Sequence, residues 1–270
     1  MKQILFYCLL FISFPTSLSA QSSTPLTIGV IHHIHSNILN EDRQINVYLP
    51  DSVSSSKTYP VIYLLDGSIH EDFIHIVGLA QFFNMMYNMP PTIIIGISNI
   101  DRKRDYTFHT DLKDLQKDYP TTGHSDKFIA FIETELQPFI EKTYPTNNIK
   151  IIIGQSLGGL LATEILLKKP NLFSHYLISS PSLWWDNESL LKNIHFYVSN
   201  KEILKKYIYI GVGGKEAKIM KNDAKQLFEN IQKSHKNIHI HFATLQPEDH
   251  ATVLHQSIYT AFKWLYQPKY

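Results

Sequence analysis

Cysteine is nearly absent from the 270-residue chain, in which Cys8 is the only one. It lies within residues 1–20, MKQILFYCLLFISFPTSLSA, which have one lysine, an apolar centre and small residues up to Ala20. This layout is typical of a secretory signal peptide. We therefore predict that residues 1–20 direct export and that residues 21–270 form a single domain. The mature domain would have no disulfide, no thiol nucleophile and no cysteine metal ligand.

Net charge and long apolar runs are also lacking. The chain has 25 basic residues (Lys and Arg) against 24 acidic ones, and loss of Lys2 with the signal would leave equal numbers. Proteins that bind nucleic acid usually carry a basic surface, so this balance argues against such a partner. Ser13 and Pro15 keep the N-terminal apolar run below the roughly 20 residues that a membrane span needs, so no span is expected after signal removal.

Runs of β-branched and aromatic residues predict eight strands, at Leu26–His35, Gln44–Leu49, Pro60–Leu65, Thr92–Ser98, Ile149–Ile153, His175–Ser179, Tyr207–Val212 and Ile238–Phe242. The first two are separated by the turn-like residues 40–43, NEDR, and should form an antiparallel hairpin. Helical patterns follow at Ser125–Lys142, Leu157–Lys169, Ala217–His235 and Thr252–Tyr266. This alternation predicts an α/β fold with a mostly parallel sheet and helices on both faces.

The stretch Ile151–Ala162, IIIGQSLGGLLA, changes from strand formers to helix formers around one hydroxyl, that of Ser156. Gly154 and Gly158 flank this serine in the pattern G-x-S-x-G. Glycines allow the sharp turn and the close approach of strand and helix that a nucleophile elbow requires. The pattern predicts that Ser156 is exposed above the sheet as a nucleophile, although a serine in a turn is also a common helix cap.

A serine nucleophile needs a base to accept its proton. The chain has 14 histidines, and topology narrows the choice because catalytic groups gather beyond the carboxyl ends of parallel strands. His250 follows the last predicted strand, in the turn before the final helix. His255 lies inside that helix and should face another way. His250 is therefore the predicted base.

The base needs an acid to hold its tautomer and orientation. Glu216 follows the seventh predicted strand and is our choice, with a solvated glutamate in a first helical turn as the alternative. Asp249 is adjacent to His250 and should point away from it. Asp223 lies about two turns into the predicted helix Ala217–His235, farther from the end of the seventh strand than Glu216.

Backbone amides should stabilise the negative charge that develops on the substrate oxygen. The amide of Leu157, next to the nucleophile, is one candidate donor. The second is expected in the loop after YLLD, from Ser68 in preference to Gly67. The histidine pairs His33/His35 and His239/His241 could bind zinc, but they lack a third ligand at a telling distance, so we expect solvent-facing strand histidines and no metal. The serine mechanism implies no cofactor.

Seven stretches carry a family resemblance, in the order RQINVYLP, YPVIYLLDG, NIDRKRDYT, FIETELQPFIEKTYP, GQSLGG, SSPSLWWD and PEDHATV. They resemble the esterase branch of the α/β hydrolases that includes the enterobactin and salmochelin esterases and, more distantly, feruloyl esterases. The resemblance covers most of residues 21–270. It implies an α/β-hydrolase fold in which Ser156 is the nucleophile and His250 the base. Because some siderophore esterases rely on a serine–histidine pair, it leaves open how much Glu216 contributes.

The resemblance also suggests substrate contacts. The arginines of NIDRKRDYT match a family segment that lines the site, so Arg104, with Arg102 behind it, could hold an anionic or catecholate substrate. The alternative for Arg104 is an ion pair with a nearby acid. Trp184 and Trp185 follow the sixth predicted strand and could stack on an aromatic ring, or could simply pack in the core.

Taken together, these features predict an exported serine esterase that acts on a small-molecule ester, with siderophore lactones or related aromatic esters favoured. A polysaccharide-linked feruloyl or acetyl ester is the next candidate. An acyltransferase would use the same residues, and a binding module on this fold would normally have lost one of them.

Overall fold

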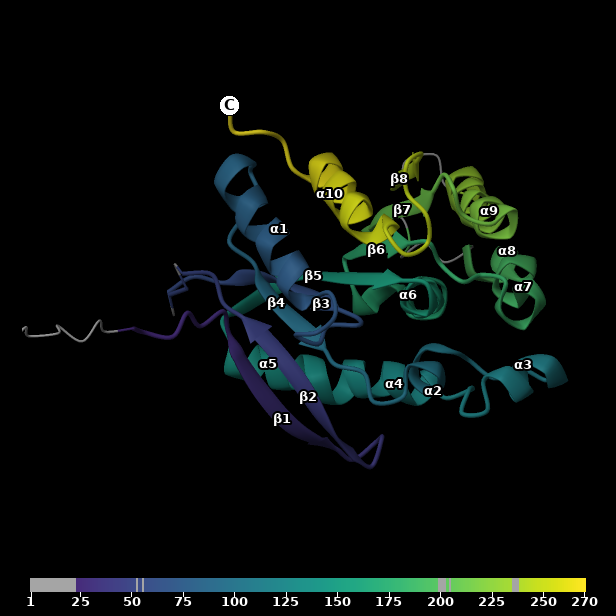
Figure 1. Ribbon diagram of the computed structural model, residues 1–270, viewed down its shortest axis with the longest axis horizontal. Helices are drawn as coiled ribbons and strands as arrows, with labels where there is room; N and C mark the ends of the chain where they lie inside the picture. Colours follow the sequence, from purple (N-terminus) through teal and green to yellow (C-terminus); the bar gives the residue numbers. More distant parts are fainter. Residues whose placement is uncertain (1–22, 52, 55, 199–202, 204, 235–237) are drawn as a thin grey trace, which may run out of the picture.

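The computed structural model describes residues 23–270 other than 52, 55, 199–202, 204 and 235–237 (Figure 1). The predicted signal peptide, residues 1–20, lies outside the described residues. Eight strands form one sheet in the order β1-β2-β4-β3-β5-β6-β7-β8. They are β1 (Val30–Ser36), β2 (Glu41–Tyr48), β3 (Tyr59–Leu64), β4 (Ile93–Ile97), β5 (Thr146–Gln155), β6 (His175–Ser179), β7 (Tyr207–Gly213) and β8 (His239–Leu245).

The sheet is antiparallel where β2 pairs with β1 and β4, and parallel from β4 through β8. Both of its faces are covered by helices. α1 (Phe73–Met86) and α10 (Val253–Leu265) cover one face, and α4 (Ser125–Phe131), α5 (Gln137–Thr143), α6 (Leu157–Lys168) and α9 (Lys218–Ser234) cover the other (Figure 1). Neighbouring residues of one strand serve opposite faces: Tyr63 packs with α6 and Ile62 with α10. The predicted α/β fold with a mostly parallel eight-stranded sheet is therefore confirmed.

Several predicted boundaries were wrong. The hairpin turns at residues 37–40, because Glu41 and Asp42 of the expected turn pair with Ser36 and His35 as part of β2. The helix predicted at Ser125–Lys142 is interrupted by a π-helical turn, Ile132–Leu136, just before Pro138, which has no N–H for a regular helical bond.

Further helices lie outside the predicted set. α1 was not predicted, and the polar stretch 99–124 contains α2 (Arg102–Tyr106) and α3 (Lys113–Asp118). After β6 come α7 (Trp185–Lys192) and α8 (Ile194–Val198). None of the helices in the described part of the chain is long and apolar enough to cross a membrane.

His175 makes the stability of the fold depend on pH. Its ring, half-buried at the start of β6, stacks on Tyr207 with 4.6 Å between ring centroids, and its Nδ1 lies 2.8 Å from Ser174 Oγ. Burial, and to a lesser extent the charge of Lys206, lower the pKa of His175 from 6.5 to about 4. Between these pH values the unfolded chain binds a proton that the folded chain does not, so the free energy of unfolding falls as the pH drops from 6.5 toward 4.

Between pH 7 and pH 4.5 we expect His175 alone to lower the free energy of unfolding by about 2 kcal/mol. Urea unfolding at the two pH values would measure this difference. His175→Phe keeps a ring against Tyr207 and should reduce the difference between the two pH values by that amount. An equal pH dependence in both proteins would show that His175 is not the source.

Candidate active site

The nucleophile elbow is formed where β5 meets α6. Ser156 has φ 59° and ψ −118°, a strained conformation that points its hydroxyl away from the sheet. A Cβ atom on Gly154 would lie 2.3 Å from the carbonyl oxygen of Gly158. The equivalent atom on Gly159 would lie 2.9 Å from Pro181 Cα. These contacts explain why the turn needs glycine on both sides of the serine.

Three predicted residues meet at the carboxyl edge of the sheet, where β5, β7 and β8 end. His250 Nε2 lies 3.0 Å from Ser156 Oγ, and His250 Nδ1 lies 2.8 Å from Glu216 Oε2. Gln155 Nε2 also donates to the His250 carbonyl oxygen at 2.6 Å, which ties the histidine loop to the elbow. The geometry is that of a nucleophile, a base and an acid in a hydrogen-bonded chain.

Glu216 is buried and fully engaged. Its Oε1 accepts hydrogen bonds from the Gly213 amide, at 2.8 Å, and from Ser180 Oγ. Burial works to raise the pKa of Glu216, but the hydrogen bonds from His250, Ser180 and Gly213 outweigh it, so its pKa lies below the ordinary value of 4.5. The carboxylate is therefore ionised at neutral pH and can orient the His250 ring.

Two serines in the loop after β6 were missed by the sequence analysis. Ser180 bonds Glu216, and Ser182 Oγ lies 3.3 Å from Ser156 Oγ while the Ser182 amide donates to the Ser156 carbonyl oxygen at 3.0 Å. The only signal for them was their place after a parallel strand, which many serines share. Ser182 adds a second hydroxyl beside that of Ser156.

The amides predicted for the oxyanion differ in their availability. Leu157 is the first residue of α6, so its N–H has no partner within the helix. Gly67 donates its N–H to the Ile97 carbonyl oxygen at 3.0 Å, so the structure does not support Gly67 as a donor. The Ser68 amide faces an exposed side chain instead and donates to Glu71 Oε2 at 3.2 Å.

Arg102 lies beside the elbow, but a carboxylate already pairs with it. Its Nε and Nη2 bind the two carboxylate oxygens of Asp66 at 2.7 and 2.9 Å, and Nη2 also donates to the Gln155 carbonyl oxygen at 3.1 Å. Arg102 thus links the loop after β3 to the residue that precedes Ser156.

Arg104, the preferred substrate contact in the sequence analysis, has other partners. It donates to both oxygens of Glu41 at 2.6 and 2.9 Å and to Asp105 Oδ1 at 2.7 Å. Asp105 in turn pairs with the buried Arg43 at 2.8 Å. This ion-pair network joins the β1–β2 hairpin to α2, so the ion-pair alternative describes Arg104 better than substrate binding.

The two tryptophans also differ from expectation. Trp185 is completely buried and donates its Nε1–H to the Phe108 carbonyl oxygen at 3.0 Å, so its predicted contact with substrate is wrong. Trp184 is partly buried against Tyr119 and Trp185, and only this ring has an exposed part.

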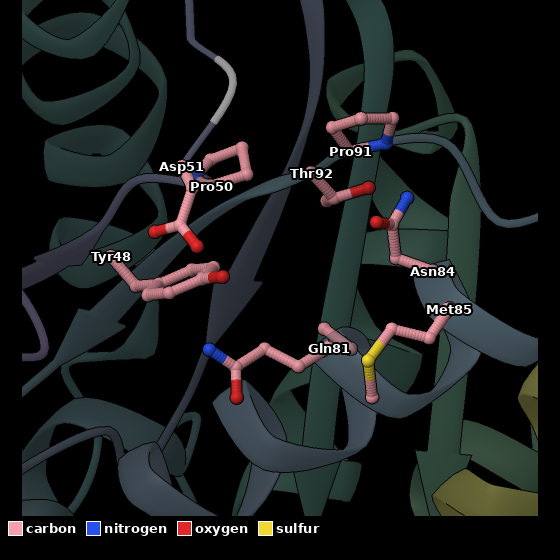
Figure 2. Close-up of a pocket in the computed structure, with 9 residues that line it drawn as sticks. Tyr48, Pro50, Asp51, Gln81, Asn84, Met85, Pro91 and Thr92 are labelled. Atoms are coloured by element: carbon pink, nitrogen blue, oxygen red, sulfur yellow. The ribbon is translucent and has the colours of Figure 1, made fainter.

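No group of three or more histidine, cysteine, aspartate or glutamate side chains in the described residues is arranged to bind a metal. A surface pocket of about 440 Å³ lies at the opposite, amino edge of the parallel strands (Figure 2). Tyr48, Asp51, Gln81 and Thr92 contribute to its walls, and it contains none of the predicted catalytic residues. The predicted catalytic residues Ser156, His250 and Glu216 lie at the other, carboxyl edge.

Comparison with known proteins identifies the family. The family model described as "Putative esterase" matches residues 36–261. The ferri-bacillibactin esterase BesA of Bacillus subtilis is 29% identical over 251 residues, covering 85% of this chain and 87% of the relative. The crystal structure of an IroE-like serine hydrolase from Shewanella oneidensis is 31% identical, has a TM-score of 0.80, and covers 88% of this chain and 79% of its own. That of the BES protein from Bacillus cereus is 28% identical, with a TM-score of 0.78 and coverages of 91% and 97%. The chain belongs to this esterase family of the α/β hydrolases and is a carboxylic ester hydrolase.

Proposed function

We propose that the protein is an exported serine esterase that cleaves siderophore lactones or related aromatic esters through an acyl-enzyme on Ser156. The observation that carries this proposal is the hydrogen-bonded chain from Glu216 through His250 to Ser156. Relatives named as ferri-bacillibactin esterase and iron(III) salmochelin esterase support the substrate class. The signal-like residues 1–20 support export.

In the proposed reaction His250 accepts the Ser156 proton as Oγ attacks the ester carbonyl, and the Leu157 and Ser68 amides bind the oxyanion. His250 then gives the proton to the leaving alcohol. Water then enters, loses a proton to the same ring and attacks the acyl carbonyl. As the bond from the acyl carbon to Ser156 Oγ breaks, His250 returns the proton to Oγ, which releases the acid and restores the free Ser156 hydroxyl. The buried Glu216 carboxylate stabilises the imidazolium in both half-reactions.

The test is to incubate residues 21–270 with bacillibactin, enterobactin and triacetylfusarinine C and to follow ring opening by mass spectrometry, with p-nitrophenyl butyrate and methyl ferulate as comparison esters. We expect at least one lactone to be opened with a kcat/KM roughly tenfold or more above methyl ferulate, within the range of 10⁴ to 10⁸ M⁻¹s⁻¹ common for enzymes. Intact lactones alongside rapid cleavage of methyl ferulate would favour the polysaccharide-ester alternative. Transfer of the acyl group to an added alcohol in preference to water would favour the acyltransferase.

A further inference from the structure

Ser182 is a buried serine that lies beside the nucleophile and outside the hydrogen-bonded chain from Glu216 to Ser156. Its side chain is 2% exposed, and its Oγ lies 3.3 Å from Ser156 Oγ. Among the described residues, Ser156 Oγ is the only hydrogen-bonding partner of this hydroxyl. A buried hydroxyl without a partner is costly, so the Ser182 side chain depends on the nucleophile for its hydrogen bond.

The backbone keeps Ser182 in this place without help from its hydroxyl. The Ser182 amide donates to the Ser156 carbonyl oxygen at 3.0 Å, and the Ser156 amide donates to the Ser179 carbonyl oxygen at 3.1 Å. Pro181 packs so closely on the elbow that a Cβ atom on Gly159 would lie 2.9 Å from Pro181 Cα. Removal of the Ser182 hydroxyl should therefore leave the loop and the elbow where they are.

The other hydrogen bonds of the site determine which serine donates. His250 Nδ1 lies 2.8 Å from the buried Glu216 carboxylate and carries the ring proton, so Nε2 is an acceptor. Ser156 Oγ lies 3.0 Å from this Nε2 and gives its only proton to it. The contact between the two hydroxyls is then a hydrogen bond that Ser182 donates and Ser156 accepts.

A donor to Ser156 Oγ acts differently in the two halves of the proposed reaction. While Oγ attacks the ester, the hydrogen bond stabilises its developing charge but also makes it a weaker nucleophile, and the two effects largely offset each other. In deacylation Oγ is the leaving group. The bond from the acyl carbon to Oγ breaks, its electron pair moves to Oγ, and His250 Nε2–H supplies the proton. A second donor on Oγ stabilises the charge that gathers there as the bond breaks.

We propose that Ser182 is a catalytic residue for deacylation, and that its hydroxyl donates to Ser156 Oγ as the acyl-enzyme is hydrolysed. This inference rests on the proposed function, because it requires an acyl group on Ser156. The separation of 3.3 Å is long for two hydroxyls. Hydrogen bonds to charged oxygens are shorter and stronger, so the contact should tighten as Oγ gains charge.

The experiment measures the two halves of the reaction separately with p-nitrophenyl trimethylacetate, whose bulky acyl group slows deacylation. The burst of p-nitrophenolate gives the rate constant of acylation. Mass spectrometry of the intact protein, after the excess ester is removed, gives the rate at which the acyl group is lost. In Ser182→Ala we expect this loss to be about fivefold slower than in the natural protein, with acylation within about twofold. Both kcat and KM for the ester should then fall, and kcat/KM should change little.

Ser257→Ala is the matched control. Ser257 is completely buried in α10, and its Oγ lies against Gly211 of β7, where it has no contact with the nucleophile. This substitution should leave acylation and deacylation unchanged. Circular dichroism of the three proteins would verify that each has the same fold.

The outcomes separate this inference from the proposed function. A purely structural role of Ser182 would slow acylation as much as deacylation, so an equal fall of both in Ser182→Ala would overturn the inference. Unchanged or faster loss of the acyl group would also overturn it, and in each case the esterase remains. If the natural protein shows no burst and no acyl group on Ser156 with this ester, with p-nitrophenyl butyrate or with the lactones, the proposed function fails and the inference falls with it.

Discussion

Ser156→Ala is expected to lower kcat/KM for every ester substrate by about 10⁴- to 10⁶-fold, because no other group would form the acyl-enzyme. The Ser156 hydroxyl lies 3.0 Å from His250 Nε2. The strained backbone at Ser156 is held by the turn between β5 and α6, not by the hydroxyl. The substitution should therefore remove the reaction without removing the fold. Steady-state kinetics and circular dichroism of the two proteins would measure both effects.

The neighbouring hydroxyl of Ser182, 3.3 Å away, makes labelling a necessary complement to the kinetics. A fluorophosphonate probe should attach one label to the peptide that contains Ser156 and none to the Ser156→Ala protein, as measured by mass spectrometry. Ser234→Ala, at the exposed end of α9, is the matched control and should retain full labelling. Persistent labelling of the Ser156→Ala protein on the peptide that contains Ser182 would show that Ser182, and not Ser156, is the nucleophile.

The strands were predictable because a sheet buried on both faces requires continuous β-branched runs, as in Ile151–Ile153 and Ile93–Ile95. α1 was not predicted. Its buried residues follow helical spacing, but Ile74, Phe82 and Met85 on its outer side are also apolar and hide the periodicity. The sequence analysis could therefore recognise strongly patterned elements and not an apolar helix with an apolar outer face.

The candidate site shows the same division. Ser156, His250 and Glu216 could be predicted because each follows a parallel strand, and the carboxyl ends of those strands share one edge of the sheet. Whether an arginine is free depends on which carboxylates fold against it, and Glu41 reaches Arg104 from 63 positions away in the chain. Such long-range pairing leaves no local pattern, so the contacts predicted for Arg104 and Trp185 did not hold.

Glu216→Gln addresses whether the third residue is needed, and we expect kcat/KM to fall by about 10²- to 10⁴-fold. The Glu216 carboxylate is buried and lies 2.8 Å from His250 Nδ1, so its charge acts on the imidazolium at short range. Glutamine is nearly isosteric but neutral. It can present either its amide nitrogen or its oxygen to His250, and the nitrogen would favour the wrong tautomer of the ring.

The free energy of unfolding at low pH provides an independent measure of the Glu216 charge. Because the pKa of Glu216 is lowered on folding, its ionised form stabilises the folded state above pH 4.5, and this contribution is lost as the pH falls through the folded-state pKa. In Glu216→Gln that part of the acid destabilisation should disappear. If Glu216→Gln loses this part of the acid destabilisation but keeps nearly full activity, Ser156 and His250 suffice as a catalytic pair. If Glu216→Gln loses both this pH-dependent stability and the activity, the buried charge of Glu216 serves the reaction as well as the fold.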